Sequence, residues 1–230
     1  MMRRAHLTAC VTLLLTAGMG VAQSQAGEWV SYRDAYRAMV LFDKYGGPKN
    51  LLQHQLQVLP REKGMLGQGV QLLIKGSTVQ TSLALDATGR TTLPLLKAAY
   101  DENAVLSPSR PLGGFTVRPR TTLALRADGA YDDAELRAAC EQALGFARYA
   151  DNAARARQCI GVRLVFSRQG EQAGVRVRAS GAEQALPLAR GAAFSGDIDD
   201  DFPVVTYRFG PAAGELITYN APLAIVPLFE

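Results

Sequence analysis

Histidine and cysteine are scarce in this sequence, and their scarcity excludes several kinds of active site. The 230 residues hold two histidines, His6 and His54, and three cysteines. If the N-terminal segment is removed, as predicted below, His54 alone remains, which excludes a zinc site built from several histidines. Cys140 and Cys159 are too few for a zinc site of cysteines alone, and their spacing excludes a CxxC redox motif.

The sequence also lacks a strong charge of either sign and any long apolar run beyond its N-terminus. Lys and Arg number 25 against 21 Asp and Glu, a net charge of +4. Arg3 and Arg4 belong to the N-terminal segment, so the remainder is too weakly basic to predict binding to nucleic acid or to an anionic membrane. No later run approaches the ~20 apolar residues of a membrane-spanning helix, so we expect no stable membrane span after cleavage.

The first 26 residues have the pattern of a secretory signal peptide. Arg3 and Arg4 precede an uncharged, mainly apolar stretch over residues 7–22, and the small residues Ser24 and Ala26 occupy the −3 and −1 positions of a signal-peptidase site. We therefore predict cleavage after Ala26 and a periplasmic or secreted protein. Cleavage after Ala22 and an uncleaved anchor helix are the alternatives that the pattern leaves open.

Export to an oxidising compartment would allow the two remaining cysteines to form a disulfide. Cys140 lies on the apolar face of a predicted helix, and Cys159 directly precedes a predicted strand. A helix packed on that strand brings the two residues within bridging distance, so we predict a Cys140–Cys159 disulfide. The alternative is a pair of buried, reduced thiols that act as small hydrophobic residues.

Periodicity predicts an α+β fold made of two similar halves, each a helix packed on a mostly antiparallel β-sheet. Apolar residues recur at helical spacing over residues 32–44, after Ser31 as N-cap, and over 132–150, where Asp132 and Glu135 resemble a capping box. Alternating or apolar runs predict strands at 52–58, 70–75, 79–85, 115–126, 162–166 and around 175–177. Beyond the signal peptide, 1–26, we place the first half at 27–120 and the second at 121–230.

The two halves also share short sequence patterns, which suggest an internal duplication. Residues 69–74 match 161–166, with Leu83 and Leu85 opposite Val175 and Val177, and 93–95 match 186–188 as Leu-Pro-Leu. Tyr32-Arg33-Asp34-Ala35 matches residues 131–134 in the predicted helices. Chance agreement in a chain rich in Ala, Leu and Arg is the alternative.

This layout resembles uncharacterised secreted proteobacterial proteins that have a signal peptide, a YxDAxRA-like helix and strand edges ending in Leu-Pro-Leu. The residues that carry the resemblance are Tyr32 to Ala38 and the two Leu-Pro-Leu segments. These are packing and turn signals, so the resemblance implies no activity. The segment 83–95 also looks like a hairpin of transthyretin-like sandwiches, although the predicted helices depart from that pattern.

Arginine pairs are the strongest candidates for a binding site. Arg118 and Arg120 share one side of a predicted strand that Pro119 suggests is an edge, and Arg176 and Arg178 share the polar face of another. Paired guanidinium groups suit carboxylates and phosphates. We therefore name these four as ligand-binding residues; an ordinary solvated sheet face is the alternative.

A second candidate is the acidic segment near residue 200. Asp197, Asp199 and Asp201 have the alternate spacing that directs oxygen atoms onto calcium. Phe202 and Arg208 stand where a calcium loop of the EF-hand kind would next need Gly and Glu. A solvated acidic loop is therefore the competing interpretation of these three residues.

Together these observations predict an exported binding protein without catalytic apparatus and without a cofactor. Its expected ligand is an acidic glycan or peptide of the cell envelope, held between the halves or on an arginine-bearing sheet face. No G-x-S-x-G elbow or dinucleotide fingerprint is present. An envelope hydrolase that uses carboxylates or His54 is the alternative function.

Overall fold

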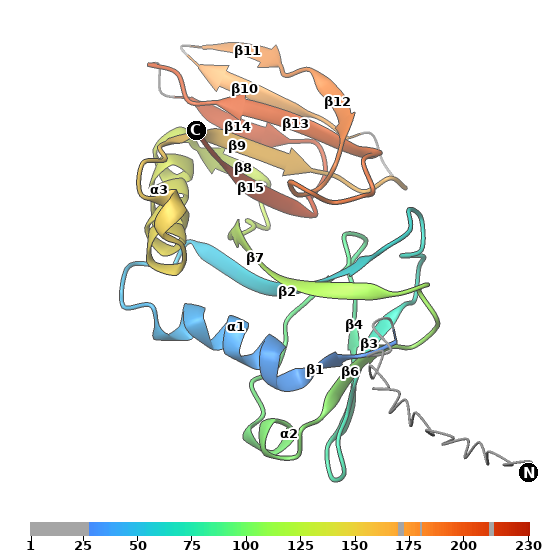
Figure 1. Cartoon of the computed structure of the whole chain (residues 1–230). Coiled ribbons are helices and arrows are strands. Elements are labelled where there is room, and N and C mark those ends of the chain that lie inside the picture. The colour runs from blue at the N-terminus through green and yellow to red at the C-terminus, as the bar shows by residue number, and fades with distance from the viewer. Residues whose placement is uncertain (1–27, 170–172, 180, 212–213) are drawn as a thin grey trace, which may run out of the picture.

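The fold is α+β, with antiparallel sheets and, in the part of the chain that the structure describes, three α-helices (Figure 1). The computed structural model describes residues 28–230 apart from 170–172, 180 and 212–213. The predicted signal peptide and its cleavage site lie outside the described residues. The helices are α1 (Tyr32–Lys44), α2 (Lys97–Asp101) and α3 (Asp133–Ala150). Within the described residues, no helix combines the length and apolar character that a membrane span requires.

A seven-stranded sheet runs through both halves of the molecule. Its strand order is β12-β13-β9-β15-β7-β2-β5. The halves join where β15 meets β7, at the single register pair of Ile225 with Leu123. The predicted boundary after residue 120 falls inside β7, and the chain leaves the first half only after Leu123. The strands are β2 (Leu52–Pro60), β5 (Arg90–Thr91), β7 (Phe115–Leu123), β9 (Cys159–Val165), β12 (Leu188–Gly191), β13 (Phe202–Arg208) and β15 (Ala224–Phe229).

Each half adds a four-stranded antiparallel sheet. The first has the order β1-β6-β3-β4 and the second the order β11-β10-β14-β8. The first contains β1 (Val30–Ser31), β3 (Gln71–Lys75), β4 (Gln80–Ala84) and β6 (Val105–Pro108). The second contains β8 (Ala130–Asp132), β10 (Val175–Ala179), β11 (Ala182–Ala185) and β14 (Glu215–Thr218).

These two small sheets have matching layouts. Each begins with a short strand that leads directly into a helix, and the later strands follow in the same spatial order, so that β1, β6, β3 and β4 correspond to β8, β14, β10 and β11. The matching layout disagrees with our alignment of the sequence. That alignment set residues 69–74 against 161–166, but the former belong to β3 of a small sheet and the latter to β9 of the central sheet. The register of the alignment is therefore wrong.

Both long helices form as their capping residues and apolar spacing predict. The side chain of Ser31 accepts a hydrogen bond from the backbone N–H of Asp34, and Asp132 accepts from the N–H groups of Ala134 and Glu135. The helix predicted at 32–44 is confirmed at both ends. A helix follows the predicted cap Asp132 to Ala150.

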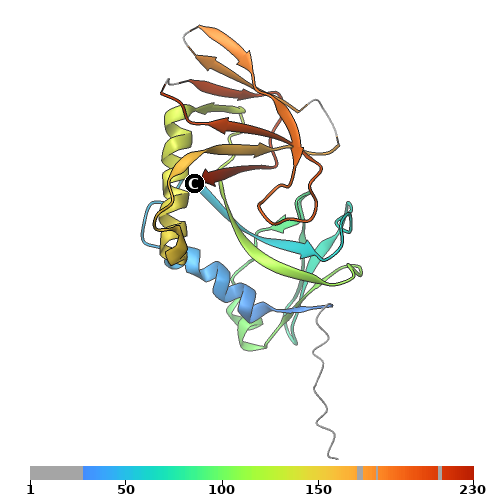
Figure 2. The same cartoon turned by 45° about the horizontal axis from the view of Figure 1, so that its top comes forward.

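Each helix buries its apolar face against the sheets of its own half. In the first half the core joins Tyr32, Ala35 and Met39 of α1 to Leu56, Val58, Leu72, Ile74 and Leu106. In the second it joins Leu136 and Ala139 of α3 to Val162, Leu164, Phe166, Val175 and Leu216. The helices follow one another along one side of the molecule (Figure 2) and meet where Phe42 and Tyr45 contact Phe146.

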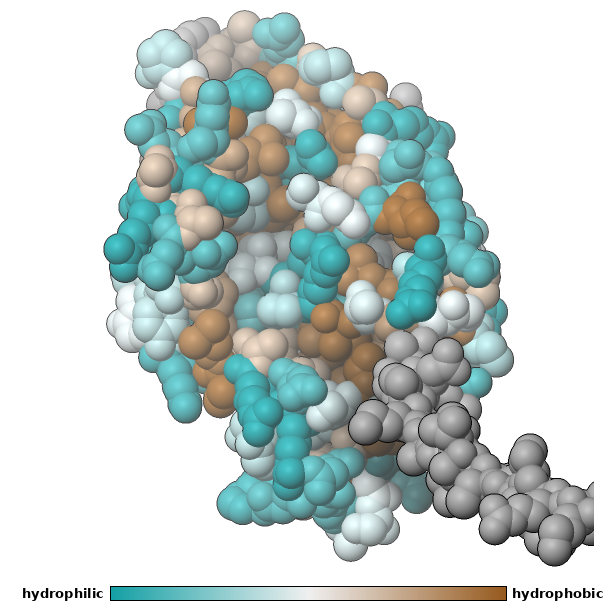
Figure 3. All heavy atoms as spheres, viewed as in Figure 1, coloured by the Kyte–Doolittle hydropathy of each residue, from teal (hydrophilic) through white to brown (hydrophobic). Residues whose placement is uncertain are grey.

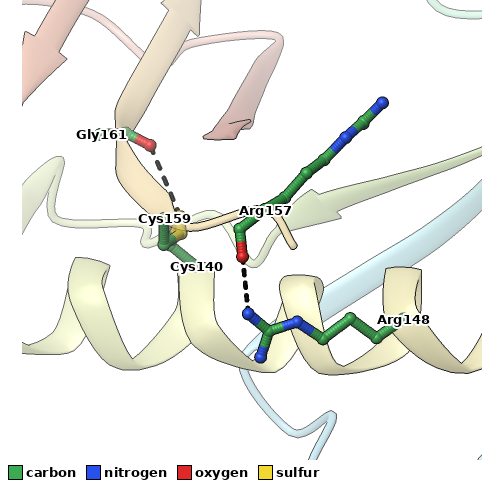
Figure 4. The surroundings of a disulfide bond; sticks show 5 residues. All are labelled: Cys140, Arg148, Arg157, Cys159 and Gly161. Atoms are coloured by element: carbon green, nitrogen blue, oxygen red, sulfur yellow. Dashed lines mark hydrogen bonds between the residues drawn. A yellow bond between two sulfur atoms is a disulfide. The ribbon is translucent and has the colours of Figure 1, made fainter. Parts of the chain in front are cut away.

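A disulfide between Cys140 and Cys159 ties α3 to the beginning of β9, as predicted. The two Cα atoms are 6.1 Å apart, and Cys140 is fully buried. Figure 4 shows the bond beside a second link between the same segments, in which the guanidinium of Arg148 donates to the backbone oxygen of Arg157 at 2.6 Å. The disulfide and this hydrogen bond thus hold α3 against the beginning of β9, the first strand that the second half contributes to the seven-stranded sheet.

Candidate functional site

Arg176 and Arg178 share one face of β10, but carboxylates of the same sheet already occupy both. Arg176 lies 3.2 Å from Glu183, and Arg178 pairs with Glu183 and, at 3.2 Å, with Glu215. The hydrogen bond between Arg178 and Glu183 raises the pKa of the guanidinium and lowers the pKa of the carboxyl. Two cations and two anions balance on this face, so it offers an anionic ligand little net attraction.

Arg120 is committed to contacts inside the protein. Its Nε donates to Gln57 at 2.6 Å and its Nη2 to Asp197 at 2.6 Å. Burial lowers the pKa of Arg120, while the Asp197 carboxylate opposes that shift. Arg118, two residues earlier on the same face, is exposed and forms no ion pair within the described part of the chain. We expected Pro119 to mark an edge strand, and this expectation is wrong. Its strand, β7, lies between β15 and β2 in the central sheet.

The partner of Arg120 belongs to a loop of the second half that contacts the first half. Residues 192–201, between β12 and β13 of the second half, lie against the central sheet of the first half. The Asp197 side chain, 6% exposed, accepts from Arg120, from Gln57 Nε2 at 2.9 Å and from the N–H of Phe194 at 3.2 Å. The guanidinium groups of Arg90 and Arg120 both lie over the Phe194 ring, 5.3 and 4.8 Å from its centre. We call residues 192–201 the latch loop.

The other acidic residues of the latch loop also face cations. Arg168 lies 3.3 Å from Asp199 and 2.7 Å from Asp201, and Lys63 pairs with Asp200. Asp199 and Asp201 therefore share Arg168, whereas Asp197 pairs with Arg120. Across residues 28–230, outside the masked gaps, no group of three or more His, Cys, Asp or Glu is arranged to hold a metal ion. The calcium prediction gains no support from this geometry.

His54 lies at the meeting point of the two halves and contacts rings instead of reactive groups. Its imidazole stacks on Phe42 with ring centres 4.5 Å apart and meets Phe146 edge-on at 5.4 Å. Nδ1 is 2.9 Å from the Thr121 hydroxyl, and the buried Nε2 has no hydrogen-bond partner. Burial lowers the pKa of His54 to about 4, with Asp43 opposing the shift. The half-buried ring of His54 therefore acts as a packing group against Phe42 and Phe146.

The His54 environment predicts acid sensitivity. The folded-state pKa of about 4 lies below the ordinary 6.5, so stability contributed by the neutral ring is complete above pH 6.5 and is lost as the pH falls towards 4. The full shift corresponds to about 3 kcal/mol, and solvent screening of this half-buried ring reduces the expected loss to roughly 1–2 kcal/mol. Urea unfolding at pH 7 and pH 4.5 measures the loss, and His54→Phe should diminish it. An equal loss in the variant would contradict this assignment.

A hollow that the sequence analysis missed lies beside the end of β6 and the loop that follows this strand. Its volume is about 490 Å³, within the range of small-ligand sites. We call it the β6 hollow; it is lined by Glu28, Lys75, Ser107, Pro108, Ser109, Arg110, Pro111, Leu112, Gly113 and Gly114. Gly113 and Gly114 adopt φ of 66° and 101°, a region that favours glycine and shapes the loop over the hollow.

The polar groups of the β6 hollow have fewer partners within the protein than Arg120, Arg176 and Arg178. Arg110 makes one long hydrogen bond, 3.4 Å, to the backbone oxygen of Met65. Among the described residues, no carboxylate pairs with Lys75 or Arg110. The Ser107 hydroxyl oxygen is buried without a hydrogen-bond partner, an arrangement that costs free energy unless another group supplies the bond. Glu28 is the one acidic residue in the lining.

A second hollow, of about 430 Å³, lies between the halves, where a ligand was also expected. Its charged groups are already engaged: Asp86 pairs with Arg90, and Arg168 with the latch loop. A hydrogen bond between Gln68 and Gln169 links its two sides. This hollow therefore has polar walls whose charges are satisfied within the protein.

Comparison with family models, with curated proteins and with solved structures found no match for this chain. The candidate site thus depends on geometry alone. No sequence signal singled out the β6 hollow, because Lys75 and Arg110 are far apart in the sequence and lie outside any motif. The Pro-Ser-Arg-Pro segment at 108–111 and the following Gly-Gly predict only a turn.

Proposed function

We propose that this protein is a non-catalytic binding module whose β6 hollow receives an anionic group of an acidic glycan or peptide. The observation that carries the proposal is the presence of two cations, Lys75 and Arg110, on one hollow with no carboxylate partner among the described residues. A guanidinium group and an ammonium group suit carboxylates, which are the charged groups of such ligands.

The remaining lining supports the same ligand class. Pro108 and Pro111 supply apolar surface beside the two cations. Figure 3 shows hydrophobic residues gathered across the middle of one face of the molecule, with hydrophilic residues along its margins. The combination of a few polar groups with apolar side chains in the lining of the β6 hollow is typical of small-ligand sites.

Export and duplication complete the proposal. The signal-peptide pattern of residues 1–26 supports a periplasmic or secreted location, and the Cys140–Cys159 disulfide is compatible with an oxidising compartment. The common strand order of the two small sheets supports two copies of one ancestral unit. The β6 hollow then belongs to the first copy, and the charge-balanced face of β10 to the second.

Removing the two cations of the β6 hollow is expected to weaken binding of an oligouronate by roughly 10- to 100-fold, because each charged contact contributes about 1 kcal/mol or slightly more. The variant is Lys75→Gln with Arg110→Gln, and titration calorimetry at low salt measures the change. Arg176→Gln with Arg178→Gln is the matched control, since it removes two cations from an internally paired face. The control should bind as the unaltered protein does.

Three outcomes contradict the proposal. Absence of binding to both an oligouronate and a glutamate-rich peptide would remove the ligand class. Loss of binding in the β10 control alone would move the site to Arg176 and Arg178. Turnover of an envelope polymer that disappears in His54→Ala would favour the hydrolase alternative.

A further inference from the structure

The free edges of the three sheets differ in how they are protected against pairing with another chain. Edge strands expose backbone N–H and C=O groups, and proteins usually guard them with charge, proline or short length. In the described parts of the chain, five of the six terminal strands have such protection. β1, β5 and β8 have two or three residues, β11 carries Glu183 and β12 carries Arg190. β4 has none of these features.

β4 is a regular five-residue strand without charge or proline. Its sequence, Gln-Thr-Ser-Leu-Ala, pairs with β3 in unbroken register from Gln80 to Ala84 (Figure 1). Every β4 residue except Leu83 is exposed. The strand is therefore free of bulges, accessible and without the side chains that usually prevent edge-to-edge association.

The backbone groups that β4 leaves unpaired can be assigned from its hairpin. The N–H of Gly76 donates to the backbone oxygen of Val79 at 2.7 Å, and hydrogen-bonded pairs alternate along an antiparallel ladder from that point. The N–H and C=O groups of Thr81 and Leu83 consequently face β3. Those of Gln80, Ser82 and Ala84 face outward.

We propose that β4 pairs antiparallel with β4 of a second copy of this chain, on a two-fold axis at Ser82. Ser82 then faces Ser82 of the other copy, and Gln80 faces Ala84. The outward groups of these three residues form six hydrogen bonds across the axis. Small uncharged side chains meet their counterparts without repulsion, which is the condition for a surface that recognises itself.

The apolar neighbours of β4 favour the same register. Val79, Leu83 and Leu85 are partly buried against the first-half core and share the core-facing side of the strand. In the proposed pair, Val79 lies opposite Leu85 of the second copy and Thr81 opposite Leu83. Each contact occurs twice, so the dimer completes the burial of side chains that the monomer leaves half-exposed. A single strand edge is smaller than the ~1,200 Å² of a stable interface, so the dimer should be weak and reversible.

Analytical ultracentrifugation of the purified protein, from low to high micromolar concentration, tests this proposal. The unaltered protein should shift from monomer towards dimer. Ser82→Lys places two ammonium groups against one another on the axis and should leave a monomer at every concentration. Gln184→Lys is the control, since it adds the same charge to an exposed position of the β11 edge, and it should dimerise normally.

Cross-linking gives a second, independent readout. Ser82→Cys should form an intermolecular disulfide under mild oxidation, because Cα atoms of a hydrogen-bonded antiparallel pair lie ~5.5 Å apart, within bridging range. Gln184→Cys should remain monomeric. A purely monomeric unaltered protein at high concentration, or a dimer that persists in Ser82→Lys, would overturn the proposal. Neither result bears on ligand binding in the β6 hollow.

Discussion

Asp197→Ala is expected to lower the free energy of unfolding by about 3–5 kcal/mol, which is the usual cost of removing one partner from a buried ion pair. The Asp197 carboxylate receives hydrogen bonds from Arg120, Gln57 and the N–H of Phe194. Its loss leaves the guanidinium of Arg120, 16% exposed, without an anion. It also removes the main polar attachment of the latch loop to the first half. Urea unfolding at neutral pH measures the change.

Asp200→Ala is the matched control for this prediction. Asp200 belongs to the same loop and pairs with Lys63, but both side chains are more than half exposed. Exposed ion pairs contribute between zero and about 1 kcal/mol, so this variant should unfold nearly as the unaltered protein does. Equal effects of the two substitutions would mean that the latch loop does not depend on its buried carboxylate.

Removing the disulfide is expected to cost about 3 kcal/mol of unfolding free energy. The bond closes a loop with a sequence separation of 19, for which the chain-entropy estimate gives this value. Cys140→Ala with Cys159→Ala is the suitable variant, since alanine introduces no polar group into the buried site of Cys140. Reduction of the unaltered protein provides the control and should cost a similar amount. A variant as stable as the oxidised protein would contradict the expected contribution.

Local features of this fold were predictable because short-range interactions determine them. Ser31 and Asp132 cap the helices that follow them, as their side chains predict. The Cys140–Cys159 disulfide could be predicted because Cys140 lies on the apolar face of a helix and Cys159 lies at the beginning of the strand on which that helix packs. By contrast, the alignment of residues 69–74 with 161–166 assigned equivalent places to β3 and β9. Runs of alternating apolar residues look alike in any strand, and only long-range pairing decides which sheet a strand joins.

The candidate site was less predictable than the fold. A sequence shows that Arg176 and Arg178 share a strand face, but it does not show that Glu183 and Glu215 reach them from neighbouring strands. Likewise, Arg120 gains its partner Asp197 from a loop of the other half. The β6 hollow is lined by β3, by β6 and by the loop after β6, because β3 and β6 are adjacent in the sheet; Lys75 and Arg110 therefore line the same hollow. Such convergence depends on topology, which no local pattern encodes.

A nuclear magnetic resonance titration tests the central claim most directly. Amide chemical shifts of the isotope-labelled protein are followed as an oligouronate is added at low salt. The account predicts that the amides of Lys75, Ser107, Arg110, Gly113 and Gly114 shift together and saturably, while those of Arg176 and Arg178 stay in place. Shifts confined to β10, or no saturable shift around the β6 hollow, would contradict it.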